Sequence, residues 1–227
     1  MNSALVLFAF LTFSAPVSAS GLADLSNRDA VQGLQEALTQ GSSAAVAKLG
    51  VPDGFLGNPS VKIPLPDAIK KVEGGLRLLG MKRQADELVT AMNRAAEKAV
   101  PEAKNLLVGA IKNMSVQDAK GILTAGDTAA TEYFRKTTSA ELAKAFLPIV
   151  TKATSSVGLA EKYNNIAAKG AKLGLVDAKQ ARIEDYVTQK TLDGLFLMLA
   201  EQEKAIRKDP VGSATGMAKK VFGLLGK

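Results

Sequence analysis

Apolar residues recur at helical spacing along most of the chain beyond its first 26 residues. Between residues 31 and 49 they follow steps of three and four, with one slack turn around Gly41 (Val31, Leu34, Leu38, Ala45 and Leu49). This spacing places them on one face of a helix. Ser26 and Asp29 precede this run with the spacing of a capping box, and Gly50 follows it as a stop signal. The pattern therefore predicts a helix between Ser26 and Gly50.

The segment "VPDGFLGNPSVKIPLPD" interrupts the helical pattern between residues 51 and 67. Three of its prolines forbid helix across it, because proline lacks a backbone N–H and restricts the residue before it (Pro59, Pro64 and Pro66). Apolar side chains alternate at Val61, Ile63 and Leu65, which is typical of an extended segment with one buried face. A lone extended segment cannot form a sheet. We expect a strap, at about residues 58–66, that lies over a helical core.

Helical patterns resume after the strap and continue to residue 208. We expect helices from Asp67 to Leu79, from Lys82 to Val100, from the Ser115–Asp118 capping box to near Gly126, from Asp127 onward, from Ser139 onward, from Gly158 to Lys169, and from Asp177 to Lys208. Pro101 is expected either to kink the helix before it or to start a new helix. Pro148 is expected to kink or end the helix that contains it. The last helix is a candidate for a break near Thr191. The fold class predicted is all-α, a single-domain multi-helix bundle with one short extended strap.

The first twenty residues have the form of a secretory signal peptide. An apolar run from Ala4 to Phe13 is followed by the small residues Val17-Ser18-Ala19, although no Lys or Arg precedes the run. We expect cleavage after Ala19, which leaves residues 20–227 as one helical domain. No later segment has the apolar length of a transmembrane helix. The expected location is the periplasm.

The composition limits the chemistry that this chain can perform. Its 227 residues include no cysteine and no histidine, and the net charge is +7. Disulfides, thiol catalysis, zinc sites with nitrogen or sulfur ligands, and imidazole bases are therefore excluded. No calcium-binding loop of the D-x-D-x-D-G type is present, so we assign no metal and no cofactor. Basic residues are scattered and aromatic residues are few, so we expect no nucleic-acid partner.

The predicted helix from Lys82 to Val100 carries polar residues beside its apolar stripe. Asn93 and Glu97 lie one turn apart at the border of the stripe, where they can reach a crevice at the edge of the core. Arg94 points away from the stripe and can pair with Glu97 at the surface. Asn93 either bonds to a neighbouring turn or helix end, because buried polar groups are normally satisfied, or belongs to a site.

A second polar edge follows about thirty residues later. Asp127, Thr131 and Arg135 are spaced four apart, with Tyr133 nearby. Asp127 is expected to cap the helix that begins there. If Asn93, Glu97, Tyr133 and Arg135 converged, they would form a polar pocket for an anionic or hydroxylated ligand.

Several motifs in order resemble a known family over nearly all of the chain beyond the leader. They are "VKIPLP", "MNRAAE", "AIKNMSVQDAKGILTAGDTAATEYFR", "LPIV", "YVTQKTLDGLF" and "EKAIRKDP". Together they resemble an uncharacterised exported helical family of Gram-negative bacteria, domain-of-unknown-function family four-one-nine-seven. The resemblance implies an exported helical protein and supplies no activity, ligand or catalytic residue.

Three interpretations of the function follow from these observations. The first is an exported, non-enzymatic helical protein that binds a small apolar or anionic ligand of the envelope. The second is a hydrolase or lyase with Glu97 or Asp127 as base and Arg135 or Arg94 as an anion clamp. The third is a structural or protein-interaction module. The cationic segment 217–227 is expected to dock on the bundle or to rest on an anionic membrane surface.

Overall fold

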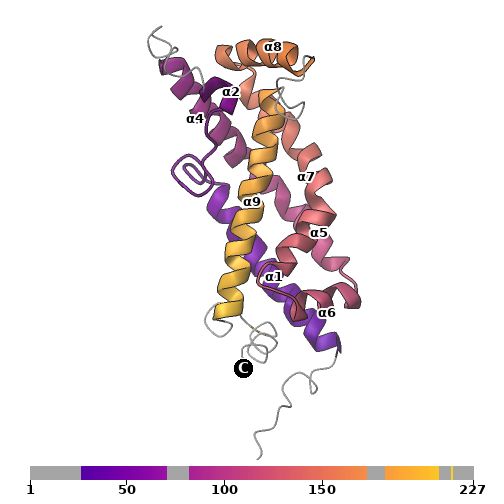
Figure 1. Cartoon of the computed structure of the whole chain (residues 1–227). Helices are drawn as coiled ribbons and strands as arrows, with labels where there is room; N and C mark the ends of the chain where they lie inside the picture. Colours follow the sequence, from indigo (N-terminus) through magenta and orange to yellow (C-terminus); the bar gives the residue numbers. More distant parts are fainter. Residues whose placement is uncertain (1–26, 71–81, 173–181, 210–215, 217–227) are drawn as a thin grey trace, which may run out of the picture.

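The computed structural model describes residues 27–70, 82–172, 182–209 and 216. Every regular element within these ranges is a helix, and none of these residues forms a strand (Figure 1). The predicted all-α class is therefore confirmed. The end of the predicted helix to Leu79, the Asp177 cap and the segment 217–227 lie outside the described residues.

The helices are numbered in chain order. Their bounds are α1 Asn27–Leu49, α2 Asp67–Lys70, α4 Lys82–Ala99, the 3₁₀ helix η1 Val100–Glu102, α5 Ala103–Lys112, α6 Val116–Thr124, α7 Ala129–Thr154, α8 Gly158–Lys172 and α9 Ile183–Lys208. The long helix α9 packs against α7 and α1, α4 packs against α7, and α8 lies across one end of this arrangement (Figure 1).

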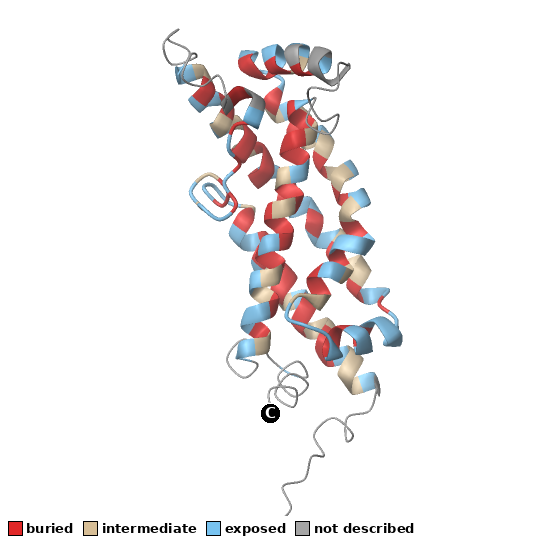
Figure 2. Ribbon diagram, viewed as in Figure 1, coloured by how far each residue is buried: buried red, intermediate tan, exposed pale blue. Residues whose placement is uncertain are grey.

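The core consists of aliphatic and phenylalanine side chains from the long helices and the strap. The buried faces of the helices turn toward one another, and their exposed faces turn outward (Figure 2). Phe134 and Phe146 from α7, Phe196 from α9 and Met92 from α4 are essentially without solvent exposure. Each such side chain contributes about 1.5–3 kcal/mol by its removal from water. In a chain without disulfides this burial is the main source of cohesion.

The strap is confirmed by the burial pattern of its residues. Val61, Ile63 and Leu65 are buried, whereas Lys62 and Pro64 between them are exposed. Residues 62–66 have no regular secondary structure, and the preceding residues 51–57 form turns. The apolar residues of the alternating pattern thus face the core, and the residues between them face the solvent.

Several predicted helix ends are confirmed. The helix that was expected to stop before Gly50 ends at Leu49. At α6 the backbone N–H of Asp118 donates to Ser115 Oγ at 3.0 Å, and the Ser115 N–H donates to Asp118 Oδ2 at 3.1 Å. This reciprocal pair is the predicted capping box.

Two proline positions show how tertiary packing overrides local signals. Pro101 lies in the 3₁₀ turn that joins α4 to α5. Pro148 does not end a helix, because α7 continues through it to Thr154. The carbonyl that Pro148 deprives of a donor belongs to Lys144, on an exposed part of the helix where water can reach it. Phe146 and Val150, on either side of the proline, are fully buried and hold both halves of α7 against the core.

The break considered near Thr191 is absent: within the described residues, the last long helix runs unbroken from Ile183 to Lys208. The hydroxyl of Thr191 donates to the carbonyl of Val187 at 2.7 Å, so this β-branched residue is accommodated within the helix. None of the helices in the described ranges is both long and apolar enough to cross a membrane.

Candidate functional site

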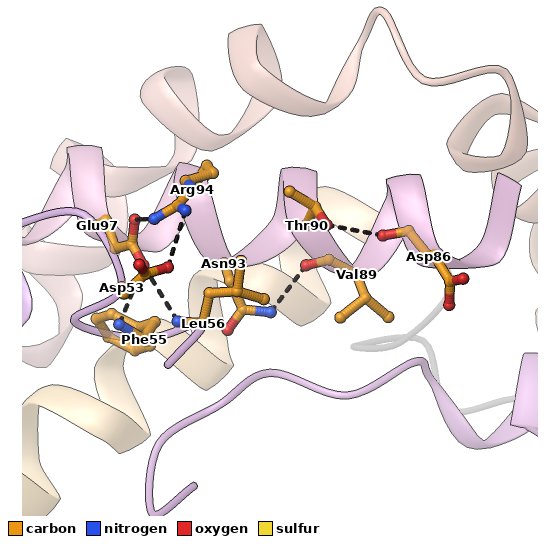
Figure 3. Close-up of polar contacts among 9 residues, drawn as sticks. All are labelled: Asp53, Phe55, Leu56, Asp86, Val89, Thr90, Asn93, Arg94 and Glu97. Carbon is orange, nitrogen blue, oxygen red and sulfur yellow. Dashed lines mark hydrogen bonds and ion pairs between the residues drawn. The ribbon is translucent and has the colours of Figure 1, made fainter. Parts of the chain in front are cut away.

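Asn93 joins α4 to the strap through both backbone groups of one residue. Asn93 Oδ1 accepts from the Ile63 N–H at 2.8 Å, and Asn93 Nδ2 donates to the Ile63 carbonyl at 2.9 Å. The same Nδ2 also donates to the carbonyl of Val89 at 2.8 Å (Figure 3). The side-chain amide therefore satisfies the extended backbone as a neighbouring strand would. With no solvent exposure, Asn93 serves as a structural bond.

Glu97 holds the turn at the start of the strap. Its Oε1 accepts from the backbone N–H groups of Phe55 and Leu56, both at 3.1 Å (Figure 3). Its Oε2 accepts from Arg94 Nη1 at 2.6 Å. Because Glu97 is only 5% exposed, these charge-assisted bonds replace the water that the carboxylate has lost. Both carboxylate oxygens are thus engaged within the protein.

Arg94 completes this cluster at the surface. Its Nη2 lies 2.8 Å from Asp53 Oδ1, so one guanidinium links α4 to the turn that precedes the strap. The hydrogen bond to Glu97 is the main cause that raises the pKa of Arg94. Asp53 has a φ of 67°, a left-handed conformation that aspartate tolerates better than most residues. We call Asn93, Arg94 and Glu97 with their partners the strap clamp.

The predicted cap of α7 is wrong. Asp127 is exposed and lies before the N-cap residue Thr128, which makes no side-chain capping bond. The N–H groups of Ala130 and Thr131 instead donate to the two oxygens of Glu203, at 3.0 and 2.9 Å. Glu203 lies on α9, 72 residues further along the chain than Thr131. A carboxylate from another helix therefore supplies the negative charge that a helix N-terminus favours.

Further bonds hold Glu203 in this position. Thr131 Oγ1 donates to Glu203 Oε2 at 2.9 Å. Arg207 approaches Glu203 Oε1 with Nε at 3.1 Å and Nη2 at 2.9 Å. Arg207 Nη2 also donates to the Ile122 carbonyl in α6 at 2.8 Å. This group ties together α6, α7 and α9.

Tyr133 and Arg135 have partners of their own. The Tyr133 hydroxyl donates to the Ala110 carbonyl at 3.0 Å, and burial raises the pKa of this phenol. The Arg135 guanidinium lies 4.6 Å from the centroid of the Phe196 ring and 3.7 Å from Glu132. No hydrogen bond or ion pair in the described part of the chain joins these side chains to those of the strap clamp. The predicted candidates therefore form separate groups, one on α4 and others along α7.

A third buried carboxylate was not predicted. Glu184 is 6% exposed and accepts from Asn164 Nδ2, at 3.1 Å for each oxygen. Asn164 Oδ1 in turn accepts from the Ile183 N–H at 2.7 Å, and Arg182 lies 3.4 Å from Glu184. An acid in the first turn of a helix is common in sequences, so nothing local signals its burial. No group of three or more acidic residues capable of holding a metal occurs in the described ranges.

A groove between α4 and α7 is lined by two cationic side chains. Its volume is about 670 Å³, and its lining comprises Lys98, Pro148, Ile149, Lys152, Ala153 and Ser156. Lys98 comes from α4 and Lys152 from α7, and neither forms a hydrogen bond or ion pair with the described residues through its ammonium group. Pro148, Ile149 and Ala153 provide apolar surface beside these charges. We call this the α4–α7 groove. Sequence reasoning missed it, because it exists only where these two helices meet.

Comparisons with known proteins give one match. The model of a family described as "Protein of unknown function (DUF4197)" matches residues 24–223. No curated protein and no solved structure matches the chain.

Proposed function

The chain belongs to the DUF4197 family, whose description states no activity, and we propose that it is an exported, non-enzymatic protein that binds an anionic amphiphile in the α4–α7 groove. The observation that carries this proposal is the pair Lys98 and Lys152, which come from different helices, line one groove and form no ion pair with the residues that the structure describes. The occupant would be a small molecule with a phosphate or carboxylate head and an apolar tail.

The chemistry of the groove supports this class of ligand. A phosphate or carboxylate attracts two ammonium groups, and the hydrogen bonds that it accepts from them are charge-assisted. Ile149, Ala153 and Pro148 offer apolar surface to the tail, whose burial contributes about 0.8 kcal/mol for each methylene. Ser156 adds a hydroxyl at the same rim. Other binding sites combine apolar walls with a few charged groups in the same way.

The geometry favours binding over acid–base catalysis. A general base needs a position in a cleft where a substrate proton can reach it. The carboxylate oxygens of the buried glutamates instead accept hydrogen bonds from backbone N–H groups, an asparagine amide or arginines (Glu97, Glu184 and Glu203). Asp127 is exposed and lies apart from the bonds that anchor the start of α7. The hydrolase or lyase interpretation therefore lacks the arranged base that it requires.

A matched pair of variants tests the binding proposal. We expect decyl phosphate, used below its micelle-forming concentration, to bind the purified chain from residue 20 in isothermal titration calorimetry. The variant Lys98→Gln/Lys152→Gln should bind at least about tenfold more weakly, because two charge-assisted contacts are lost. The control Lys104→Gln/Lys120→Gln removes the same charge from α5 and α6, outside the groove, and should bind as the unaltered protein does. Equal weakening in both variants would refute the assigned site.

Export rests on the leader sequence and has its own test. Residues 4–13 and the small residues before Ser20 support cleavage after Ala19. Expression of the full chain in a Gram-negative host should yield a periplasmic product whose N-terminal sequence begins Ser20-Gly21-Leu22. Cytoplasmic protein that retains Met1 would refute export and would leave the binding experiment unaffected.

A further inference from the structure

We propose a second binding site, of opposite preference, in a groove between α7 and α9: it takes the ammonium group of a cationic amphiphile. This groove has a volume of about 560 Å³ and is lined by Ala143, Lys144, Leu147, Asp185, Thr188, Gln189 and Leu192. It lies on the α9 side of α7, whereas the α4–α7 groove lies on the α4 side. We call it the α7–α9 groove. The inference does not depend on the proposed function.

Thr188 provides the first observation. It is 6% exposed, it lines the groove, and its hydroxyl has no hydrogen-bond partner among the described residues. The other threonines that are buried in the described ranges all have partners. Thr138, Thr154 and Thr191 donate to the carbonyl four residues earlier, and Thr131 donates to Glu203. A buried hydroxyl without a partner is costly, so most proteins avoid it. No hydrogen bond in the described ranges holds this hydroxyl, so it is available to a molecule that enters the groove.

Asp185 provides the second observation. It lies one turn before Thr188 on α9, is partly exposed, and has no hydrogen-bond or ion-pair partner within the described residues. The cation among the lining residues, Lys144, already pairs with Glu141 at 2.8 Å. The carboxylate of Asp185 is therefore the uncompensated charge among the residues that line this groove.

The groove thus gathers the Asp185 carboxylate and the Thr188 hydroxyl, both of which can accept hydrogen bonds. An ammonium group donates three hydrogen bonds and accepts none, so it matches this set.

The apolar part of the lining supports an amphiphile over a small cation. Ala143, Leu147 and Leu192 form apolar surface next to the acceptors. A bare ammonium ion would gain nothing from these side chains, whereas an alkyl tail would bury area against them. Decylamine and decyl phosphate share one tail and differ in the charge of the head. The binding of decylamine therefore reports on the α7–α9 groove, and the binding of decyl phosphate reports on the α4–α7 groove.

The test measures the binding of both probes to the same set of variants. We expect decylamine to bind the unaltered protein, and Asp185→Asn/Thr188→Val to weaken its binding about tenfold or more. The control Asp86→Asn/Thr90→Val changes the same residue types on α4 and should leave the affinity unchanged. The single variant Asp185→Asn, at a partly exposed position, keeps the test valid if the double variant folds poorly. Lys98→Gln/Lys152→Gln should retain decylamine binding, so failure of either groove is recognised separately.

In NMR spectra, decylamine should shift the methyl signals of Leu147 and Leu192. The proposal is overturned if decylamine does not bind, if Asp185→Asn leaves its affinity unchanged, or if the shifted signals lie outside the α7–α9 groove.

Discussion

The ring of Phe55 lies against the backbone of Gly194, so the turn that precedes the strap is in direct contact with the middle of α9. A Cβ atom at position 194 would lie 2.7 Å from Phe55 Cε1 and 3.3 Å from the Cβ of Val61. Phe55 has no solvent exposure, and its backbone N–H is held by Glu97. The ring is therefore confined between α9 and the strap clamp, with little room to move.

Substitution of Gly194 by alanine should destabilise the protein. The added methyl group must displace the Phe55 ring, and overpacking of this kind costs about 1–3 kcal/mol. Urea unfolding of Gly194→Ala, followed by circular dichroism, should show a lower midpoint. Gly109→Ala in α5 and Gly121→Ala in α6 are matched controls, since an added Cβ meets nothing within 4 Å. These controls should gain up to about 1 kcal/mol from helix propensity. A Gly194→Ala protein as stable as they are would contradict the observed packing.

Loss of the Asn93 amide should release the strap. In Asn93→Leu the N–H and carbonyl of Ile63 lose their partners in a buried place, at a cost of at least about 2 kcal/mol. Hydrogen exchange of the Ile63 amide should accelerate more than that of amides in α7. Thr90→Ala, one turn earlier on the exposed face of α4, should change stability by less than about 0.5 kcal/mol. Unchanged protection of Ile63 would show that the strap is held in another way.

The start of α7 should depend on Glu203 and should be insensitive to Asp127. Glu203→Gln replaces one acceptor oxygen by an NH₂ group and removes the charge that faces Arg207, so we expect a loss of about 3–5 kcal/mol, the usual cost when a buried ion pair is broken. Asp127→Ala changes an exposed residue, and we expect an effect within about 0.5 kcal/mol. Thermal unfolding of both variants measures the difference. A larger effect of Asp127→Ala would restore the cap that the sequence predicted.

Alkaline unfolding should depend on Tyr186. Its hydroxyl donates to the Pro64 carbonyl at 3.1 Å, and burial, followed by the charge of Asp67 and by Tyr163, raises the pKa of Tyr186 to about 12. An acid whose pKa is higher in the folded protein than in the unfolded protein stabilises the fold. This stabilisation is complete at any pH where the acid is protonated in both the folded and the unfolded protein. This contribution is complete below pH about 10, the ordinary pKa of tyrosine, and is lost as the pH rises toward about 12.

Between pH 10 and 12, the stability of the variant Tyr186→Phe should therefore decline less than that of the unaltered protein. Ultraviolet titration of tyrosinate absorbance, together with unfolding at each pH, measures both quantities. Tyr133→Phe serves as the comparison, because its phenol is less buried and lies away from the strap. Identical pH profiles for Tyr186→Phe and the unaltered protein would contradict the role assigned to this residue.

Local patterns in the sequence determined the helical class, the strap and the polar border of α4. The three- and four-residue spacing of apolar positions and the capping box at Ser115 act within one or two turns, so they could be interpreted without knowledge of the fold. The alternation of Val61, Ile63 and Leu65 with polar residues and proline likewise predicted that these three side chains are buried. The same projection placed Asn93 and Glu97 at the edge of the core, where both are found.

Only the tertiary structure decided which groups these polar side chains meet. Asn93 bonds to a residue 30 positions away, and the N–H groups at the start of α7 bond to Glu203 rather than to the acid next to them in sequence. Pro148 remains within a helix because the core holds both of its flanks. Both grooves form only where helices distant in sequence come together. Helix periodicity fixes the direction of each side chain around its own axis, whereas the partner across the interface depends on how whole helices pack.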